Sequence, residues 1–147
     1  MKSLFTSIVC ILISLNIHAQ IIETNSSSVP TTIGSFNKAL GSQAYLIQTV
    51  NPGDTIYTLR FKSYGDQDFK TISFNEQGGT LNSLYKILIS FFYPENKKTN
   101  NYKRTFKLGN KVITCTISTA GNLSVVFSTN HGFFLMTEKQ CGKLFGK

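Results

Sequence analysis

The sequence predicts an α+β domain. We expect an antiparallel sheet of about six to seven strands, in the order βββαββββα, with one amphipathic helix packed on it and a short C-terminal helix. Three observations predict this fold. Seven short segments are rich in β-branched and aromatic residues, a helical spacing of leucines interrupts them after the third, and a capping motif precedes a final short helix. The same alternation would fit an open sheet or a more closed barrel.

The first three strands are expected at 44–50, 55–64 and 69–75, joined by the turn sequences NPGD and GDQD. In TIYTLRFKSY, aromatic and aliphatic side chains alternate with Thr, Arg and Lys, so one face is predicted to be core and the other solvated.

A helix is expected to follow in TLNSLYKILISFFY, because Leu81, Leu84, Leu88 and Phe91 recur at helical spacing. Thr80 is predicted to be the N-cap. Pro94 is predicted to end the helix.

The second half returns to strand patterns. Four strands are expected in KRTFKL, KVITCTIS, NLSVVFST and GFFLMT, with the short turn-forming spacers GN, AGN and NHG between them. After the last strand, Thr137 and Gln140 have the spacing of a capping box, which predicts the start of the C-terminal helix.

Three regions are predicted along the chain: a signal peptide at 1–19, a flexible leader at 20–43 rich in Ser, Thr and Asn, and a single domain at 44–147. Lys2, an apolar run and the small residue Ala19 carry the first prediction. The ending HAQ resembles the signals of exported proteins of Gram-negative bacteria. We therefore expect an exported protein, periplasmic or extracellular, with no transmembrane span after cleavage.

The few cysteines and histidines limit the disulfides and metal sites that the chain can form. Cys10 lies in the predicted signal peptide, which leaves Cys115 and Cys141. Both are predicted to point inward, so they form either a disulfide, which an exported protein can keep, or two buried thiols. His131 is the single histidine after cleavage, and no CxxC or HxxxH spacing occurs. We predict no metal site and no cofactor.

Catalytic groupings are sparse. His131 lies in the turn sequence TNHG, and Asp66 and Asp68 lie in the turn sequence GDQD, where turn formation explains the residue types without catalysis. EQGG precedes the helix and could offer backbone N–H groups to an anion, but it lacks the lysine of a P-loop. We expect a protein that is not an enzyme.

Charge is the remaining signal. The chain has 15 basic and 7 acidic side chains, and the stretch after Glu95 is basic and interleaved with Tyr93, Tyr102 and Phe106. Such a stretch can bind polyanions, or it can be a solvated loop running into a charged edge strand. Lys103 and Lys107 are expected on the outer face of their strand, with Arg104 on the opposite face. The candidate polyanion-binding residues are Lys97, Lys98, Lys103, Arg104, Lys107 and Lys111.

These observations support three hypotheses. The first is a small exported noncatalytic binding or interaction module of the bacterial cell envelope, whose specificity the sequence leaves open. The second is a polyanion binder acting through segment 97–111, with lipopolysaccharide, acidic glycan or DNA as ligand. The third is an enzyme or inhibitor with unrecognised chemistry. The sequence leaves the partner unknown; the two candidates are an anionic envelope component and a protein.

Overall fold

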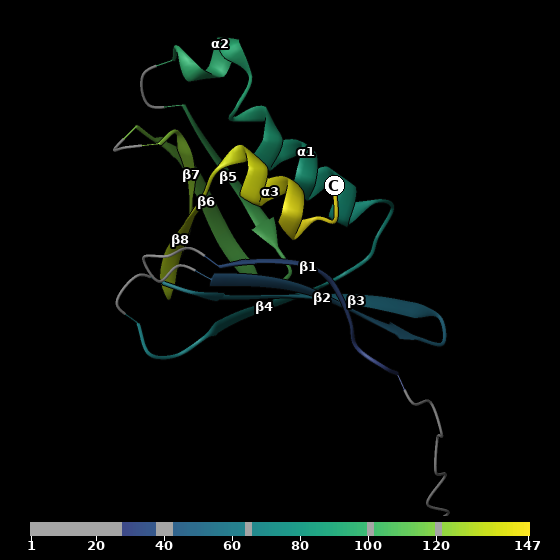
Figure 1. The fold of residues 1–147 in the computed structure, drawn as a ribbon. Helices are drawn as coiled ribbons and strands as arrows, with labels where there is room; N and C mark the ends of the chain where they lie inside the picture. The colour runs from purple at the N-terminus through teal and green to yellow at the C-terminus, as the bar shows by residue number, and fades with distance from the viewer. Residues whose placement is uncertain (1–27, 38–42, 64–65, 100–101, 120–121) are drawn as a thin grey trace, which may run out of the picture.

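The computed structural model describes residues 28–37, 43–63, 66–99, 102–119 and 122–147. The predicted signal peptide and the first part of the predicted leader lie outside them. The protein is mainly β, with two four-stranded antiparallel sheets and a few short helices (Figure 1).

Each sheet is a meander in which neighbouring strands in the chain are neighbours in space. The first sheet contains β1 (Thr31–Asn37), β2 (Gln43–Asn51), β3 (Asp54–Lys62) and β4 (Lys70–Asn75). The second contains β5 (Lys103–Leu108), β6 (Lys111–Ser118), β7 (Ser124–Thr129) and β8 (Gly132–Met136). Helices α1 (Thr80–Ser90) and α2 (Pro94–Lys97) connect the sheets, and α3 (Glu138–Leu144) follows the second sheet. Each half thus begins with four strands, which are followed by α1 and α2 in the first half and by α3 in the second.

The predicted single sheet of six to seven strands is wrong. The described chain has eight strands, and no backbone hydrogen bonds join β4 to β5 as sheet neighbours. The physical reason is the connection: α1 and α2 lead the chain away from the edge of β4, so β5 begins a new sheet. Side-chain alternation specifies which face of a strand is buried, but it does not specify which strand edges meet.

The predicted leader also requires a correction. Within it, Thr31–Asn37 forms β1, which pairs antiparallel with β2. Phe36 is the buried anchor of this strand, and its ring lies 6.2 Å from that of Phe134. At Gly34, a Cβ atom would collide with the backbone carbonyls of Lys143 and Leu144, so the glycine lets α3 approach β1 closely.

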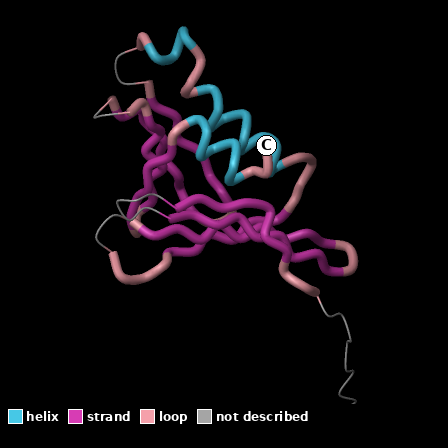
Figure 2. The backbone as a smooth tube through the Cα atoms, in the orientation of Figure 1, coloured by secondary structure: helices cyan, strands magenta, loops and turns pink. Residues whose placement is uncertain are grey.

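The core lies between the inner faces of the two sheets and the helices. Figure 2 shows the sheets meeting at an angle, with α1 and α3 packed in the space between them. Phe61 of β3 joins the sheets, because its ring centroid lies 4.9 Å from Phe134 of β8 and 6.3 Å from Phe127 of β7. All three rings are fully buried.

Helix α1 buries Leu84 and Leu88 as predicted, and Phe91 is buried directly after it. Its start differs from the prediction. Gly79 rather than Thr80 occupies the N-cap position, and the Glu76 carboxylate accepts hydrogen bonds from the backbone N–H groups of residues 79–81.

The end of α1 also differs, because the helix stops at Ser90, and Pro94 begins α2. Proline suits the first position of a helix, where its missing N–H is not needed.

The C-terminal helix begins as predicted. Thr137 and Gln140 form a reciprocal capping box, in which the Gln140 Oε1 atom accepts the Thr137 N–H at 2.8 Å. Within the described ranges, none of the helices has the length and apolar character needed to cross a membrane.

Candidate functional site

The structure divides the predicted basic segment between two faces of the second sheet. Paired residues of neighbouring strands point to the same side of a sheet. Arg104 pairs with Cys115, and Lys111 pairs with Leu108. Since Cys115 and Leu108 are buried, Arg104 and Lys111 project from the inner face. Lys103 and Lys107 project from the outer face, as predicted.

The first two lysines of the segment lie elsewhere. Lys97 is the last residue of α2 and Lys98 is its C-cap, and both side chains are exposed. This short helix stands apart from the sheets in Figure 1. The candidate polyanion-binding residues therefore do not form one continuous patch: α2 and the two faces of β5–β6 each carry a pair.

No described helix covers the outer face of the second sheet, because α1 and α3 both pack on its inner side (Figure 1). Two rows of side chains cross it. One row runs Lys103, Thr116, Val126 and Leu135, and the other runs Thr105, Thr114, Ser128 and Phe133. The pair Lys107 and Val112 lies on the same side of the sheet, next to the second row. We call these ten residues the outer face. None of them is acidic.

The two lysines of the outer face form no ion pair with any residue that the structure describes. The one ion pair among the described residues joins Lys70 and Asp66, at 3.8 Å. Lys103 and Lys107 lie at the edge of the sheet, four residues apart on one strand, which corresponds to about 13 Å at ~3.3 Å per residue. Their exposed side chains are available to a ligand with spaced negative charges.

Phe133 is the aromatic residue of this surface, and sequence reasoning did not single it out. Its side chain is 43% exposed. The signal was present: consecutive residues of a strand face opposite sides, so one phenylalanine of the pair at 133–134 had to point outward. Two aromatics that were considered face the core instead. Tyr102 packs edge-on against Phe91 at 4.8 Å, and Phe106 packs against the core.

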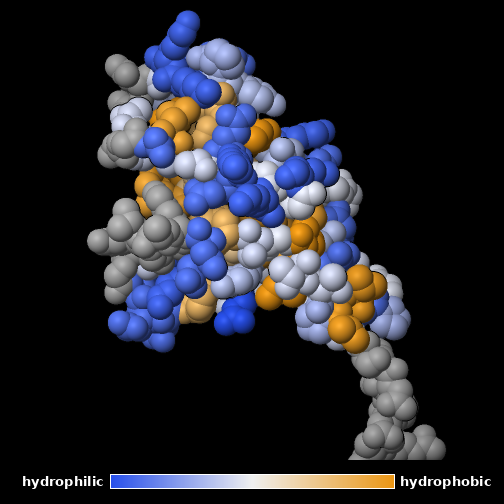
Figure 3. All heavy atoms as spheres, viewed as in Figure 1, coloured by the Kyte–Doolittle hydropathy of each residue, from blue (hydrophilic) through white to orange (hydrophobic). Residues whose placement is uncertain are grey.

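Hydrophobic residues do not form a broad patch on the side of the molecule shown in Figure 3, where they appear as separate areas among hydrophilic ones. The large hydrophobic residues that are exposed come from different elements; they are Val29, Val50, Tyr93, Val112 and Phe133. Such scattered side chains are ordinary on a protein surface.

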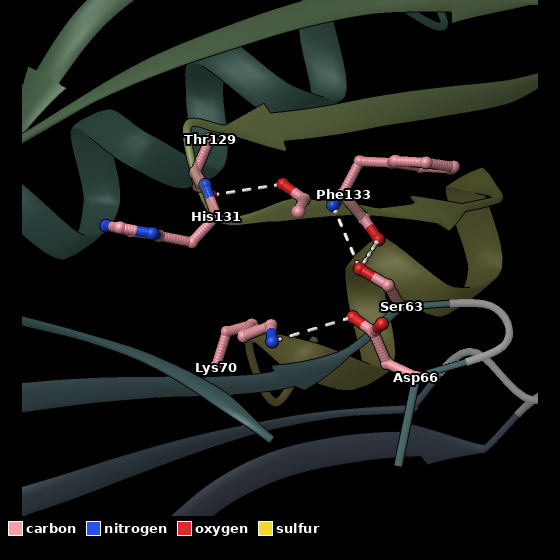
Figure 4. A network of polar contacts seen from close by, with 7 residues as sticks. Ser63, Asp66, Lys70, Thr129, His131 and Phe133 are labelled. Atoms are coloured by element: carbon pink, nitrogen blue, oxygen red, sulfur yellow. Dashed lines mark hydrogen bonds and ion pairs between the residues drawn. The ribbon is translucent and has the colours of Figure 1, made fainter. Parts of the chain in front are cut away.

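Two of the residues considered for catalysis, Asp66 and His131, lie where the turn between β7 and β8 meets the β3–β4 connection (Figure 4). Ser63 is the polar centre of this region and is buried. Its hydroxyl donates to the Phe133 carbonyl at 2.6 Å and accepts the Phe133 N–H at 3.0 Å. A hydroxyl held by both backbone groups of one residue serves as a structural bridge rather than as an activated nucleophile.

The other members of this region show no catalytic pairing. Asp66 is bound to Lys70, and the backbone N–H of His131 donates to Thr129 Oγ1 at 3.0 Å, as in a turn. Among the described residues, the His131 ring has no hydrogen bond to a hydroxyl, thiol or carboxylate, whereas nucleophilic catalysis needs such a base beside the nucleophile. Asp68 is exposed in the same connection.

Cys115 and Cys141 are both fully buried and both carry free thiols in the structure. Burial is the main cause that raises the pKa of each thiol to about 12, with smaller upward contributions from the neighbouring Cys141 thiol for Cys115 and from the Glu138 carboxylate for Cys141. Such thiols are poor nucleophiles near neutral pH. A disulfide between them stays a prediction.

Neither an anion site before α1 nor a metal site is formed by the described residues. The N–H groups after EQGG, a conceivable anion site, are occupied by the Glu76 carboxylate. In the described part of the chain, no three His, Cys, Asp or Glu side chains lie close enough to hold a metal ion.

Comparison of the chain with protein-family models, with curated proteins and with solved structures found no match.

Proposed function

We propose that the protein is a noncatalytic binding module of the bacterial cell envelope that binds polyanions through the outer face, with Lys103 and Lys107 as its cationic groups. The observation that carries the proposal is a sheet face that has no acidic residue and bears two lysines, neither of which forms an ion pair with a described residue. The location at the envelope rests on the predicted signal peptide.

The chemistry of the face suits a charged, hydroxyl-rich or ring-bearing chain. Lysine ammonium groups pair with phosphate, sulfate or carboxylate, the hydroxyls of Thr105, Thr114 and Ser128 can accept or donate hydrogen bonds, and Phe133 can stack on a sugar or base. Phe133 lies three strands from the lysine edge, about 14 Å at ~4.8 Å per strand spacing. A chain lying across the strands would reach both.

Association through exposed lysines depends on salt, because binding releases the counterions of the polymer. We expect the purified protein to bind immobilised lipopolysaccharide, acidic glycan or DNA, with an affinity that falls steeply as salt rises. All three polymers are anionic, so comparing the affinities of the protein for them identifies which polymer it prefers.

The test variant is Lys103→Glu with Lys107→Glu, and the matched control is Lys86→Glu with Lys139→Glu, on exposed positions of α1 and α3. Both variants change the net charge equally. The proposal predicts loss of binding in the first only, because the helices lie on the opposite side of the sheet. An equal loss of polyanion binding in both variants would show that net charge alone causes the binding. Unchanged binding in the first variant would reject the outer face as the site.

A further inference from the structure

A small pocket lies where the two sheets meet, on the inner side of the second sheet and away from the outer face. Its floor is apolar, formed by the buried Phe61 of β3 and Ile72 of β4. Three side chains that can carry positive charge stand around it: Lys70 of β4, Lys111 of β6 and His131 of the turn before β8. No acidic residue is among those that line it.

Three different elements bring Lys70, Lys111 and His131 to the pocket. Lys111 pairs with the buried Leu108, so its side chain points toward the first sheet. His131 is carried by the turn between Thr129 and Gly132, which pair across the hairpin. Lys70 begins β4, directly below that turn in Figure 4. Three residues distant in the sequence thus converge on one opening.

Glycines allow two turns of the second sheet, the β5–β6 turn and the β7–β8 turn, to lie close to the first sheet. A Cβ on Gly132 would lie 2.7 Å from Ser63 Oγ and 3.9 Å from Lys70 Cε. At Gly109, in the turn between β5 and β6, a Cβ would collide with the Ser73 carbonyl. Larger residues would push these turns outward, so the pocket depends on close contacts that the glycines permit.

The size of the pocket limits its ligand. Its volume is about 110 Å³, equivalent to roughly four water-sized groups at ~30 Å³ each. Pockets for drug-sized ligands are about 300 Å³ or larger. A small molecule, or a short end group, fits.

Charge selects the kind of ligand. The Lys70 side chain is 32% exposed and forms an ion pair with Asp66, whereas Lys111 has no ion pair among the described residues. Positive groups around an apolar floor repel one another, and an anion between them relieves the repulsion. A charge-assisted hydrogen bond to a carboxylate is roughly twice as strong as a neutral one.

We propose that this pocket binds a small aliphatic carboxylate, with its short hydrocarbon chain on Phe61 and Ile72 and its carboxylate between Lys111, Lys70 and His131. This site is independent of the polyanion surface. Lys111, grouped with that surface by sequence, belongs to the pocket.

The probe is butyrate, titrated into the purified protein and followed by backbone amide NMR. Two comparison ligands separate the contributions: butyramide has the same shape without the charge, and inorganic phosphate has charge without the chain. We expect saturable shifts at residues 70–72, 111 and 129–132 with butyrate, and at least tenfold weaker binding of both comparison ligands.

The test variant is Lys111→Met, which keeps an unbranched side chain one atom shorter and removes its charge, and the control is Lys86→Met on the exposed side of α1. Loss of one charged hydrogen bond should weaken butyrate binding by about tenfold or more, and Lys70→Met should weaken it as well. The control should bind as the wild type does.

Three results would overturn the proposal: no saturable shift at the pocket, equal binding of butyrate and butyramide, or an equal loss in Lys86→Met. Polymer binding by Lys111→Met serves as a separate readout. It should be unchanged, so failure of the pocket and failure of the outer face are distinguishable.

Discussion

Ser63 shows how one side chain joins the two sheets at the scale of single residues. Its hydroxyl satisfies both backbone groups of Phe133, seventy residues away. Ser63→Ala should lower the free energy of unfolding by about 1–3 kcal/mol, because it leaves a donor and an acceptor without partners. The control is Ser73→Ala, whose hydroxyl has an exposed contact with Thr58. Denaturant unfolding measures both, and equal small effects would contradict the bridging role.

The buried cysteines predict how stability responds to alkaline pH. Burial raises the pKa of Cys115 and of Cys141 from 9.0 to about 12. The folded protein therefore keeps protons that the unfolded chain loses above pH 9, so stability is full below that pH and falls as pH rises toward 12. At pH 10 the loss is about 1.4 kcal/mol for each thiol, roughly 3 kcal/mol for both.

Unfolding in reductant at pH 7 and pH 10 tests this, with the double variant Cys115→Ala and Cys141→Ala as comparison. The small cavities of the variant lower its free energy of unfolding by the same amount at both pH values. The free energy of unfolding of the wild type should fall by roughly 3 kcal/mol more than that of the variant between pH 7 and pH 10. An equal fall in the two proteins would contradict the raised pKa of the thiols.

At the scale of elements, Glu76 is the cap of α1, although it lies before the helix. Its carboxylate accepts the N–H groups of Thr80 at 2.8 Å and Leu81 at 3.2 Å, while Gly79 at the N-cap has no side chain to do so. Glu76→Gln should lower stability by about 1 kcal/mol, because the charge and one acceptor are lost at the positive end of the helix.

Thermal unfolding at neutral pH measures the effect of Glu76→Gln. The control is Glu95→Gln, at an exposed position in the first turn of the four-residue helix α2. A melting temperature lowered equally by both changes would contradict a specific role for Glu76.

The elements themselves were largely predictable. Alternation located seven of the eight strands, and Thr137 with Gln140 located α3, because local spacing directly reflects local geometry. The strand β1 was missed because Phe36 is its one buried side chain, so its sequence lacks the apolar alternation. The cap of α1 was missed because Glu76 reaches it across two glycines with positive φ, Gly78 and Gly79.

At the scale of the whole molecule, α3 closes the fold by packing on β1, so the last element holds the first described one. Gly34→Ala should cost about 1–3 kcal/mol, because a methyl group would displace the backbone of Lys143 and Leu144. Ser35→Ala, at an exposed position of the same strand, is the control. A Gly34→Ala protein as stable as the control, by denaturant unfolding, would show that α3 and β1 are not tightly packed.

The arrangement of the elements was not predictable from local patterns. The division into two sheets depends on how α1 and α2 redirect the chain, and the pocket depends on contacts between residues 70, 111 and 131 that no spacing reveals. For the basic segment, alternation correctly placed Lys103 and Lys107 together and Arg104 opposite.

The most direct test of the central claim is to map a bound polyanion on the protein by backbone amide NMR, using a short heparin-like oligosaccharide or oligonucleotide at low salt. The account predicts shifts on the outer face, at Lys103, Thr105, Lys107, Thr114, Ser128 and Phe133, that disappear as salt is raised. Shifts confined to α1, α3 or the first sheet, or no shifts at any site, would contradict it.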